Sequence, residues 1–227
     1  MNVIPQAVKD GFVRVIAPVA RALIGAGVHP NTITTVGTLV IVGGGVAFGA
    51  GWVHWAGFLL LFSGLFDILD GQVARQGGKT TTFGAFYDST LDRVGESAIF
   101  SGVAVHFMRG GVPAERVPVA VLAAMVALAA SMLVSYTRAR AEGLGIDCKV
   151  GFAARAERLL ALGLPALVFG AGPQLYWIVV ILALATVVTV VQRVVHVARV
   201  SGTAEGGRRR RETVPTRMPA TGKGVER

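Results

Sequence analysis

Long uncharged stretches follow one another along the chain, and each is long enough to form a helix across a lipid bilayer. A crossing needs about 20 predominantly apolar residues. The sequence predicts four membrane-spanning helices, over residues 32–51, 52–75, 83–108 and 115–142, and the second and third also carry charged residues. The uncharged run 159–192 is too long for one ordinary crossing, and Gly170-Ala171-Gly172-Pro173 divides it into two helices. The pattern therefore predicts an all-α integral membrane protein with six transmembrane helices.

The N-terminal residues 1–20 show a different pattern, in which apolar positions recur with a helical period. The apolar stripe consists of Ile4, Val8, Phe12, Val15 and Val19, and the charged residues lie off it. This is typical of an amphipathic helix that lies in the membrane interface beside the bundle; a helix that packs on the bundle is the other interpretation. A six-helix domain follows over residues 21–200. From Ser201 to Arg227 the chain is rich in Gly, Arg and Pro, which predicts a disordered basic tail.

Composition and charge agree with a membrane location. The chain is 53% hydrophobic and 15% charged, with a mean hydropathy of +0.62. Cations cluster at the N-terminus, around residues 75–79, in the segment 138–158 and in the tail, whereas the turns near residues 50 and 172 carry no charge. The positive-inside rule explains this alternation and the net charge of +9 without a nucleic-acid partner. We predict a multi-pass protein of the cell membrane, surrounded by membrane lipids, with both termini in the cytoplasm.

Four of the six aspartates lie in one short part of this apolar chain. They are Asp67, Asp70, Asp88 and Asp92. Because a helix turns about 100° per residue, the first two share one helix face, and so do the last two. The short polar loop 76–82 makes the two helices antiparallel neighbours. We therefore expect the four carboxylates to converge near the cytoplasmic end of the bundle.

Four like charges at close range repel one another strongly unless a cation neutralises them. Carboxylate oxygens favour hard divalent cations, so Mg²⁺ is the predicted cofactor, with Mn²⁺ as an alternative. Four aspartates suffice for two ions, and two adjacent metals suit a displacement at phosphorus. The competing structural interpretation pairs the aspartates with Arg75, Lys79 or Arg93 at the interface.

Carboxylates inside a membrane protein could also line a pathway for divalent cations. A transporter of this kind would spread polar residues through the depth of the membrane, whereas here they gather at one end beside a basic segment. A scaffold without catalytic activity would not need four aspartates in this arrangement. The sequence thus favours an active site. The single cysteine, Cys148, excludes an internal disulfide and a cysteine-based metal site.

The spacing of the aspartates forms a longer motif. It reads Asp67-x-x-Asp70-Gly71-x-x-Ala74-Arg75, eight residues, Gly84, three residues, Asp88, three residues, Asp92. This motif resembles the signature of the CDP-alcohol phosphotransferase family, and the resemblance extends over residues 20–200. It implies a magnesium-dependent membrane enzyme, commonly a homodimer. Such an enzyme moves a phosphatidyl group from CDP-diacylglycerol to an alcohol and releases CMP.

The same resemblance implies roles for individual residues. Asp67, Asp70 and Asp88 would bind the metals, and Asp92 would join them or act as the catalytic base on the acceptor hydroxyl. The nucleotide pocket would use six residues, namely Pro30, Asn31, Thr34, Gly71, Ala74 and Arg75. No Ser or Cys has an adjacent base in the sequence, so we expect direct in-line attack, with inversion at phosphorus.

A second informative tract runs over residues 135–159 and is rich in cations. It contains Arg138, Arg140, Lys149, Arg155 and Arg158, and Arg193 and Arg199 follow near the end of the last helix. Arg155 and Arg158 are three residues apart and can face one ligand on a helix. Because arginine forks match phosphate oxygens, the tract favours a phosphorylated acceptor over a neutral alcohol. Positive-inside charge accounts for some of these residues.

The basic tract also resembles that of actinobacterial phosphatidylinositol phosphate synthases, a branch of the family that uses inositol 1-phosphate (1D-myo-inositol 3-phosphate). This resemblance implies an inositol phosphate pocket. Its residues would be Ser135, Arg138, Arg155, Arg193 and Arg199. Glycerol 3-phosphate, the acceptor of phosphatidylglycerophosphate synthases, is the main alternative, because it is also anionic and those enzymes share the aspartate pattern.

Overall fold

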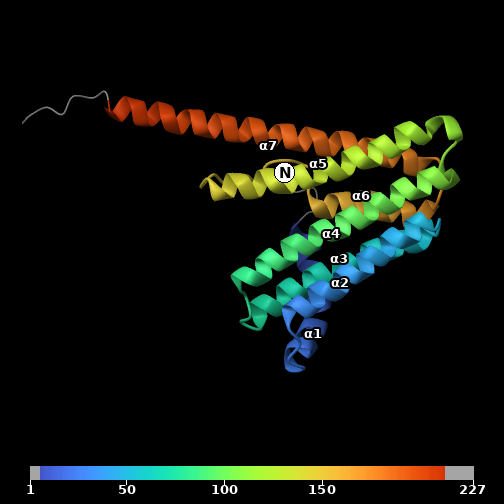
Figure 1. Ribbon diagram of the computed structural model, residues 1–227. Helices are drawn as coiled ribbons and strands as arrows, with labels where there is room; N and C mark the ends of the chain where they lie inside the picture. Colours follow the sequence, from blue (N-terminus) through green and yellow to red (C-terminus); the bar gives the residue numbers. More distant parts are fainter. Residues whose placement is uncertain (1–5, 213–227) are drawn as a thin grey trace, which may run out of the picture.

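The computed structural model describes residues 6–212, which form seven α-helices and two short helical turns (Figure 1). The helices are α1 (Gln6–Gly25), α2 (Pro30–Gly49), α3 (Val53–Gln76), α4 (Thr82–His106), α5 (Val117–Gly143), α6 (Arg155–Phe169) and α7 (Gln174–Glu212). A π-helical turn (Phe107–Gly111) and a 3-10 turn (Ala114–Arg116) connect α4 to α5. The all-helical fold is confirmed, and α2 to α7 correspond in order to the six helices that the sequence predicts.

Four helical stretches among the described residues are long and apolar enough to cross a membrane. They are Pro30–Gly49, Val53–Gln76, Ala114–Gly143 and Gln174–Gly202. The chain is thus a multi-pass membrane protein. Helix α4 does not belong to this set because charged residues occupy its first half, and α6 does not because it has only 15 residues.

Helix α2 packs closely on both α3 and α4, which barely contact each other. We predicted α3 and α4 to be direct antiparallel neighbours, and this is wrong: each packs mainly on α2. Glycines explain the close approach of α2 and α4, because a Cβ atom at Gly102 would overlap the backbone carbonyl of Gly45. The aspartates of α3 and α4 therefore meet around the N-terminal end of α2.

Helix α6 connects this group to the outer pair formed by α5 and α7. It packs on α3, where a Cβ atom at Gly57 would come within 2.7 Å of the carbonyl oxygen of Gly163. The main hydrophobic core joins these helices, with Phe48, Leu60, Ile99, Leu162 and Val179 among its buried side chains. This arrangement brings the N-terminus of α6, with Arg155, beside the acidic segments of α3 and α4.

Helix α1 packs on α3 through Ile16 and Ala20, which are buried in a small cluster with Leu69 and Val73. Of the predicted apolar stripe, Val15 and Val19 lie on another side of the helix and are 75% and 51% exposed. Ile4 and the side chains of Val8 and Phe12 lie outside what the structure describes. An exposed apolar side suits contact with the membrane interface. At the other end, α7 continues to Glu212, beyond the position where we predicted the tail to begin. Residues 213–227 of that tail, and residues 1–5, lie outside the described residues.

Candidate active site

A cavity of about 160 Å³ opens where the N-termini of α2 and α4 meet the C-terminal end of α3. All six residues predicted for the nucleotide pocket line it, namely Pro30, Asn31, Thr34, Gly71, Ala74 and Arg75. The carboxylates of Asp70 and Asp88 also border this cavity, together with Lys79 from the turn before α4. The structure thus brings together residues that are more than 40 positions apart in the chain.

Local capping interactions define the rim of the cavity. Helix α2 begins at Pro30, and the side chain of His29 accepts a hydrogen bond from the backbone N–H of Asn31 at 3.2 Å. Helix α4 begins after Thr81, whose hydroxyl accepts from the N–H of Gly84 at 2.9 Å. Such caps satisfy N–H groups that have no partner within the first turn of a helix. They fix the starts of both helices beside the end of α3.

Asp70 is 7% exposed and is held by α2. Its carboxylate accepts a hydrogen bond from the hydroxyl of Thr34 at 2.7 Å. A buried carboxylate needs such partners, because its transfer from water is otherwise very costly. The contact fixes the Asp70 side chain at the wall of the cavity.

Two small residues keep the cavity wall open. A Cβ atom at Gly71 would lie 3.0 Å from Nη1 of Arg75, and one at Gly84 would lie 3.0 Å from the hydroxyl of Thr81. Both distances are tighter than ordinary van der Waals contact. Glycine at these two positions therefore leaves room beside the carboxylates that a larger residue would fill.

Arg155, the first residue of α6, lies between the other two aspartates. Its Nη1 atom forms an ion pair with Asp67 of α3 and another, at 2.9 Å, with Asp92 of α4. Asp92 also lies 3.5 Å from the guanidinium of Arg93. The side chains of Asp92 and Arg155 are each 19% exposed, so this cluster is open to solvent on one side.

The four aspartates therefore form two pairs, with Asp70 and Asp88 at the cavity and Asp67 and Asp92 on Arg155. Because each pair draws one aspartate from α3 and one from α4, within about one turn of the other, the four like charges repel one another. In this arrangement no three acidic, His or Cys side chains among residues 6–212 converge on one metal position. The donor set nevertheless fits a hard divalent cation, since it is all carboxylate oxygen. Arg155 already places a positive charge between two members.

Of the five residues predicted to bind the acceptor, Arg155 contacts two aspartates. The other four belong to α5 and α7, and their partners lie elsewhere. Ser135 donates to the carbonyl of Ser131, and Arg138 pairs with Glu142 at 2.9 Å. Arg193 is buried, and its guanidinium donates to the carbonyls of Val134 and, at 3.0 Å, Val150. Arg193, on α7, therefore links the segment before α6, through Val150, to α5, through Val134.

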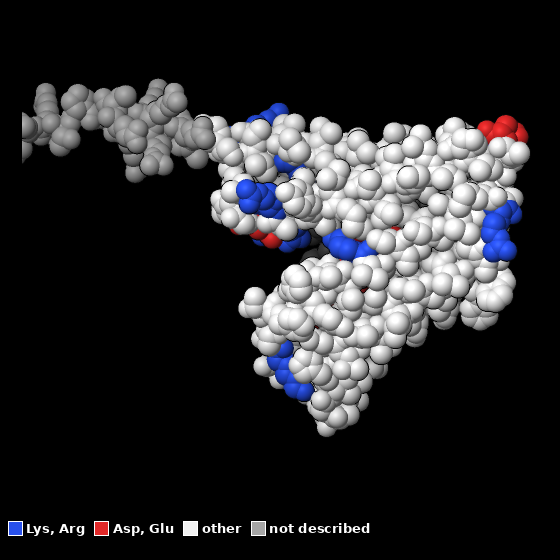
Figure 2. Space-filling view, in the orientation of Figure 1, with Lys and Arg blue, Asp and Glu red and all other residues white. Residues whose placement is uncertain are grey.

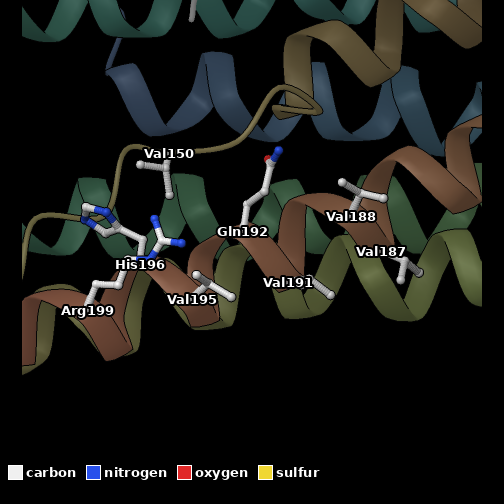
Figure 3. A pocket seen from close by; sticks show the side chains of 8 residues that line it. All are labelled: Val150, Val187, Val188, Val191, Gln192, Val195, His196 and Arg199. Atoms are coloured by element: carbon white, nitrogen blue, oxygen red, sulfur yellow. The ribbon is translucent and has the colours of Figure 1, made fainter. Parts of the chain in front are cut away.

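Arg199 lies further along α7, in a groove of about 510 Å³ (Figure 3). Valines line most of this groove, and Arg199 and His196 stand at one end of it (Figure 3). The structure thus places Arg199 at a separate opening from the cavity that Asp70 and Asp88 border.

The prediction that Arg155 and Arg158 face one ligand is wrong, because Arg158 is 3% exposed and pairs with Glu96. Glu96 is a site-adjacent residue that sequence reasoning missed. The signal was present in part: Glu96 follows Asp92 by four residues, which continues the acidic face of that helix. Its partner lies 62 positions away, and no local pattern indicates that pairing.

The surface is mostly uncharged along the helices and is hollowed between α5 and the first half of α4 (Figure 2). Lys and Arg side chains gather at the margin of this hollow (Figure 2). A basic margin around an acidic interior suits ligands that carry phosphate and bind together with a metal ion.

Comparison with known proteins agrees with this geometry. The family model described as CDP-alcohol phosphatidyltransferase matches residues 27–191. A phosphatidylinositol phosphate synthase of Streptomyces avermitilis is 40% identical over 207 residues, which is 86% of this chain and 82% of that protein.

Solved structures of a Mycobacterium tuberculosis phosphatidylinositol phosphate synthase share the fold. The structure with CDP-DAG bound is 35% identical, with a TM-score of 0.72, over 81% of this chain and 94% of that one. The structure in complex with manganese and citrate is 33% identical, also with a TM-score of 0.72, over 91% and 95% of the two chains.

Proposed function

Because the chain belongs to the CDP-alcohol phosphatidyltransferase family, we propose that it transfers the phosphatidyl group of CDP-diacylglycerol to inositol 1-phosphate (1D-myo-inositol 3-phosphate). The products are phosphatidylinositol phosphate and CMP. The observation that carries this proposal is the position of Arg155, whose guanidinium fork suits phosphate, against two aspartates beside the cavity. Relatives named phosphatidylinositol phosphate synthase support the choice of acceptor.

The cytidine diphosphate of the donor binds in the cavity. Its wall offers the hydroxyl of Thr34, the amide of Asn31 and the cations of Arg75 and Lys79. Gly71 and Ala74 leave space for the nucleotide against α3. The relative solved with CDP-DAG bound supports this assignment by its shared fold.

We propose that Asp67, Asp70 and Asp88 hold divalent metal, two ions of Mg²⁺ or Mn²⁺, and that Asp92 joins them or acts as the base on the acceptor hydroxyl. The manganese-bound relative and the carboxylate donor set support this. When bound, the metal supplies charge stabilisation for the pyrophosphate and for the departing CMP. Metal bound by these carboxylates would compete with the guanidinium of Arg155 for the same oxygens and would free it to bind the acceptor phosphate beside them.

The acceptor binds through Arg155, with Ser135, Arg138, Arg193 and Arg199 completing its pocket. A phosphate on Arg155 keeps the acceptor within reach of Asp92, whose carboxylate lies 2.9 Å from that guanidinium in this structure. Asp92 takes the proton of the attacking hydroxyl as general base. The alkoxide attacks the phosphatidyl phosphorus in line, and the bond from that phosphorus to the CMP oxygen breaks.

All six helices α2 to α7 cross the membrane in this proposal, and α1 lies in the interface. The charged half of α4 is accommodated because Asp88, Asp92 and Glu96 face the inside of the bundle. Both termini and the site then lie on the cytoplasmic side, where CDP-linked lipid and acceptor meet. The protein acts as a homodimer, which light scattering of the detergent complex tests.

The test uses purified protein in detergent with Mg²⁺ and CDP-diacylglycerol. CMP release is followed with inositol 1-phosphate, glycerol 3-phosphate and free inositol supplied separately, with Asp92→Asn as the inactive control. We expect release with inositol 1-phosphate. If CMP is released with glycerol 3-phosphate instead, the acceptor is glycerol 3-phosphate and the protein is a phosphatidylglycerophosphate synthase. If no alcohol causes CMP release and the protein carries Mg²⁺ into liposomes, the protein is a cation transporter and the proposed enzymatic function is wrong.

A further inference from the structure

A second ion pair joins α4 to α6, one helical turn away from the pair between Asp92 and Arg155. Glu96 follows Asp92 by four residues, and Arg158 follows Arg155 by three, so each lies on the same side of its helix one turn along. The guanidinium of Arg158 donates to the carboxylate of Glu96. Their side chains are 3% and 2% exposed, so the pair is buried inside the bundle.

Arg158 also holds the residues that precede α6. Its Nη1 atom donates to the carbonyl oxygen of Ala153 at 2.6 Å. The N–H of Ala153 in turn donates to the hydroxyl of Thr189 on α7 at 3.3 Å. Because α6 begins two residues later, these contacts fix where the helix starts. They therefore fix the direction in which the Arg155 side chain leaves the backbone.

On the other side of the pair, Glu96 is linked to the catalytic helix face through Arg93. The guanidinium of Arg93 lies 3.5 Å from Glu96 and 3.5 Å from Asp92. A chain of alternating charges results, which runs through Asp67, Arg155, Asp92, Arg93, Glu96 and Arg158. The chain contains three negative and three positive groups, so its net charge is zero. Its most buried ion pair is the one between Glu96 and Arg158.

A buried ion pair is a costly way to hold two helices together. Apolar residues of similar size often stabilise a fold as well or better, because the two ions lose their hydration on burial. Helix α6 already packs on α3 through Gly57 and Gly163 and also contacts α7. A role in placing other groups therefore explains the pair better than cohesion does.

We infer that Glu96 and Arg158 are positioning residues for the acceptor step, which set the distance at which Arg155 meets Asp92. This inference rests on the proposed function. The nucleotide cavity is lined by α2, the end of α3 and the first turns of α4, and neither member of the pair belongs to it. Binding of the acceptor depends on the pair, and binding of CDP-diacylglycerol does not.

The test replaces both charges by apolar side chains, as Glu96→Leu with Arg158→Met, in the full-length protein. Thermal unfolding and the KM values for the two substrates are measured separately. We expect an unchanged unfolding midpoint and an unchanged KM for CDP-diacylglycerol. The kcat/KM for inositol phosphate falls roughly 10- to 100-fold, as a displacement of about 1 Å suffices for a loss of that size. If the pair has only a structural role, the double variant has less active protein but both KM values are unchanged. That result would overturn the inference.

A conservative variant decides the matter if the double variant does not fold. Arg158→Lys keeps the charge and loses the fork that reaches Glu96 and Ala153 at once. A raised KM for inositol phosphate supports the inference, and a KM equal to that of the unaltered protein overturns it. The matched control is Asp147→Asn with Lys149→Gln, an exposed pair at 2.9 Å, which leaves all values unchanged.

The unaltered protein in the same assay separates the two claims. If it releases no CMP with inositol phosphate, the proposed function is wrong, and the inference that rests on it is wrong as well. If it is active and the apolar double variant is equally active, only the inference about Glu96 and Arg158 fails.

Discussion

At the scale of single residues, Arg155 is the side chain that connects the acidic helices to the basic tract. Its guanidinium contacts Asp67 and Asp92, and in the proposed reaction it exchanges them for an acceptor phosphate. Arginine suits this exchange because its planar fork binds carboxylate and phosphate in the same geometry.

Arg155→Ala removes the proposed phosphate anchor. We expect kcat/KM for inositol phosphate to fall by roughly 30- to 1,000-fold, since a charge-assisted pair of this kind contributes about 2–4 kcal/mol. The measurement is CMP release against inositol phosphate concentration. Lys149→Ala, whose side chain is 70% exposed, is the control. An Arg155→Ala enzyme with normal kcat/KM contradicts the assignment.

Thr34→Val removes the hydroxyl that donates to Asp70 at 2.7 Å while it keeps the shape of the side chain. Loss of a partner that orients a metal-binding carboxylate typically weakens metal binding 10- to 100-fold, and we expect about 10-fold here. Titration of the protein with Mn²⁺, followed by electron paramagnetic resonance, measures the affinity. In the control Thr137→Val, the lost hydroxyl donates within its own helix. Equal Mn²⁺ affinity in both variants argues against metal at Asp70.

Much of the site at this scale could be predicted from the sequence, because a fixed spacing on two helices determines which residues share a face. Asp70, Gly71 and Arg75, which the motif spacing places near one face of α3, line one cavity, and Thr34, which only the family resemblance implies, lines it too. Arg193 and Arg158 could not be placed in this way. A single sequence shows their charge, but not that they are buried against the carbonyls of Val150 and Ala153.

At the scale of helices, α2 and α4 pack most closely in their C-terminal halves, away from the cavity at their N-termini. Gly45 and Gly102 allow this approach, since a side chain on Gly102 would overlap the carbonyl of Gly45. Small residues at helix contacts are common in membrane proteins, where association depends on packing.

Gly102→Ala forces α2 and α4 apart and is expected to destabilise the protein by about 1–3 kcal/mol, as overpacking does. The thermal unfolding midpoint in detergent measures the effect. Gly64→Ala is the matched control, because a Cβ atom there meets nothing within 4 Å. Equal midpoints for the two variants would show that the close approach does not determine stability.

Most of the helices were predictable, since charge-free runs and the Gly-Pro break mark their limits, although the first half of α4 carries charged residues. Which helices pack against one another was less predictable. The loop 76–82 suggested direct packing of α3 on α4, but both pack mainly on α2, whose glycines allow a close approach. Tertiary packing of this kind depends on contacts between distant segments, which periodicity within one segment does not reveal.

At the scale of the whole molecule, the alternation of charged and uncharged connections implies one orientation in the membrane. The segment that carries Lys149 then faces the cytoplasm, and the turn with Glu115 faces the other side. Both residues are exposed, and the native Cys148 is buried, so single introduced cysteines can report on each side.

Glu115→Cys is expected to react with a membrane-impermeant maleimide in intact cells, and Lys149→Cys only after the membrane is made permeable. The unaltered protein, with Cys148 alone, serves as the unlabelled control. Labelling of Lys149→Cys in intact cells would show that the orientation is the reverse of the predicted one and that the active site lies outside the cytoplasm.

The most direct test of the proposed function is a competition between acceptors. Purified protein, Mg²⁺ and CDP-diacylglycerol are mixed with equal concentrations of inositol 1-phosphate and glycerol 3-phosphate, and the lipid product is identified by mass spectrometry. The product ratio reports the ratio of the two kcat/KM values. We predict phosphatidylinositol phosphate as the main product, formed only with divalent metal. Phosphatidylglycerophosphate as the main product, or no lipid product at all, would contradict the account.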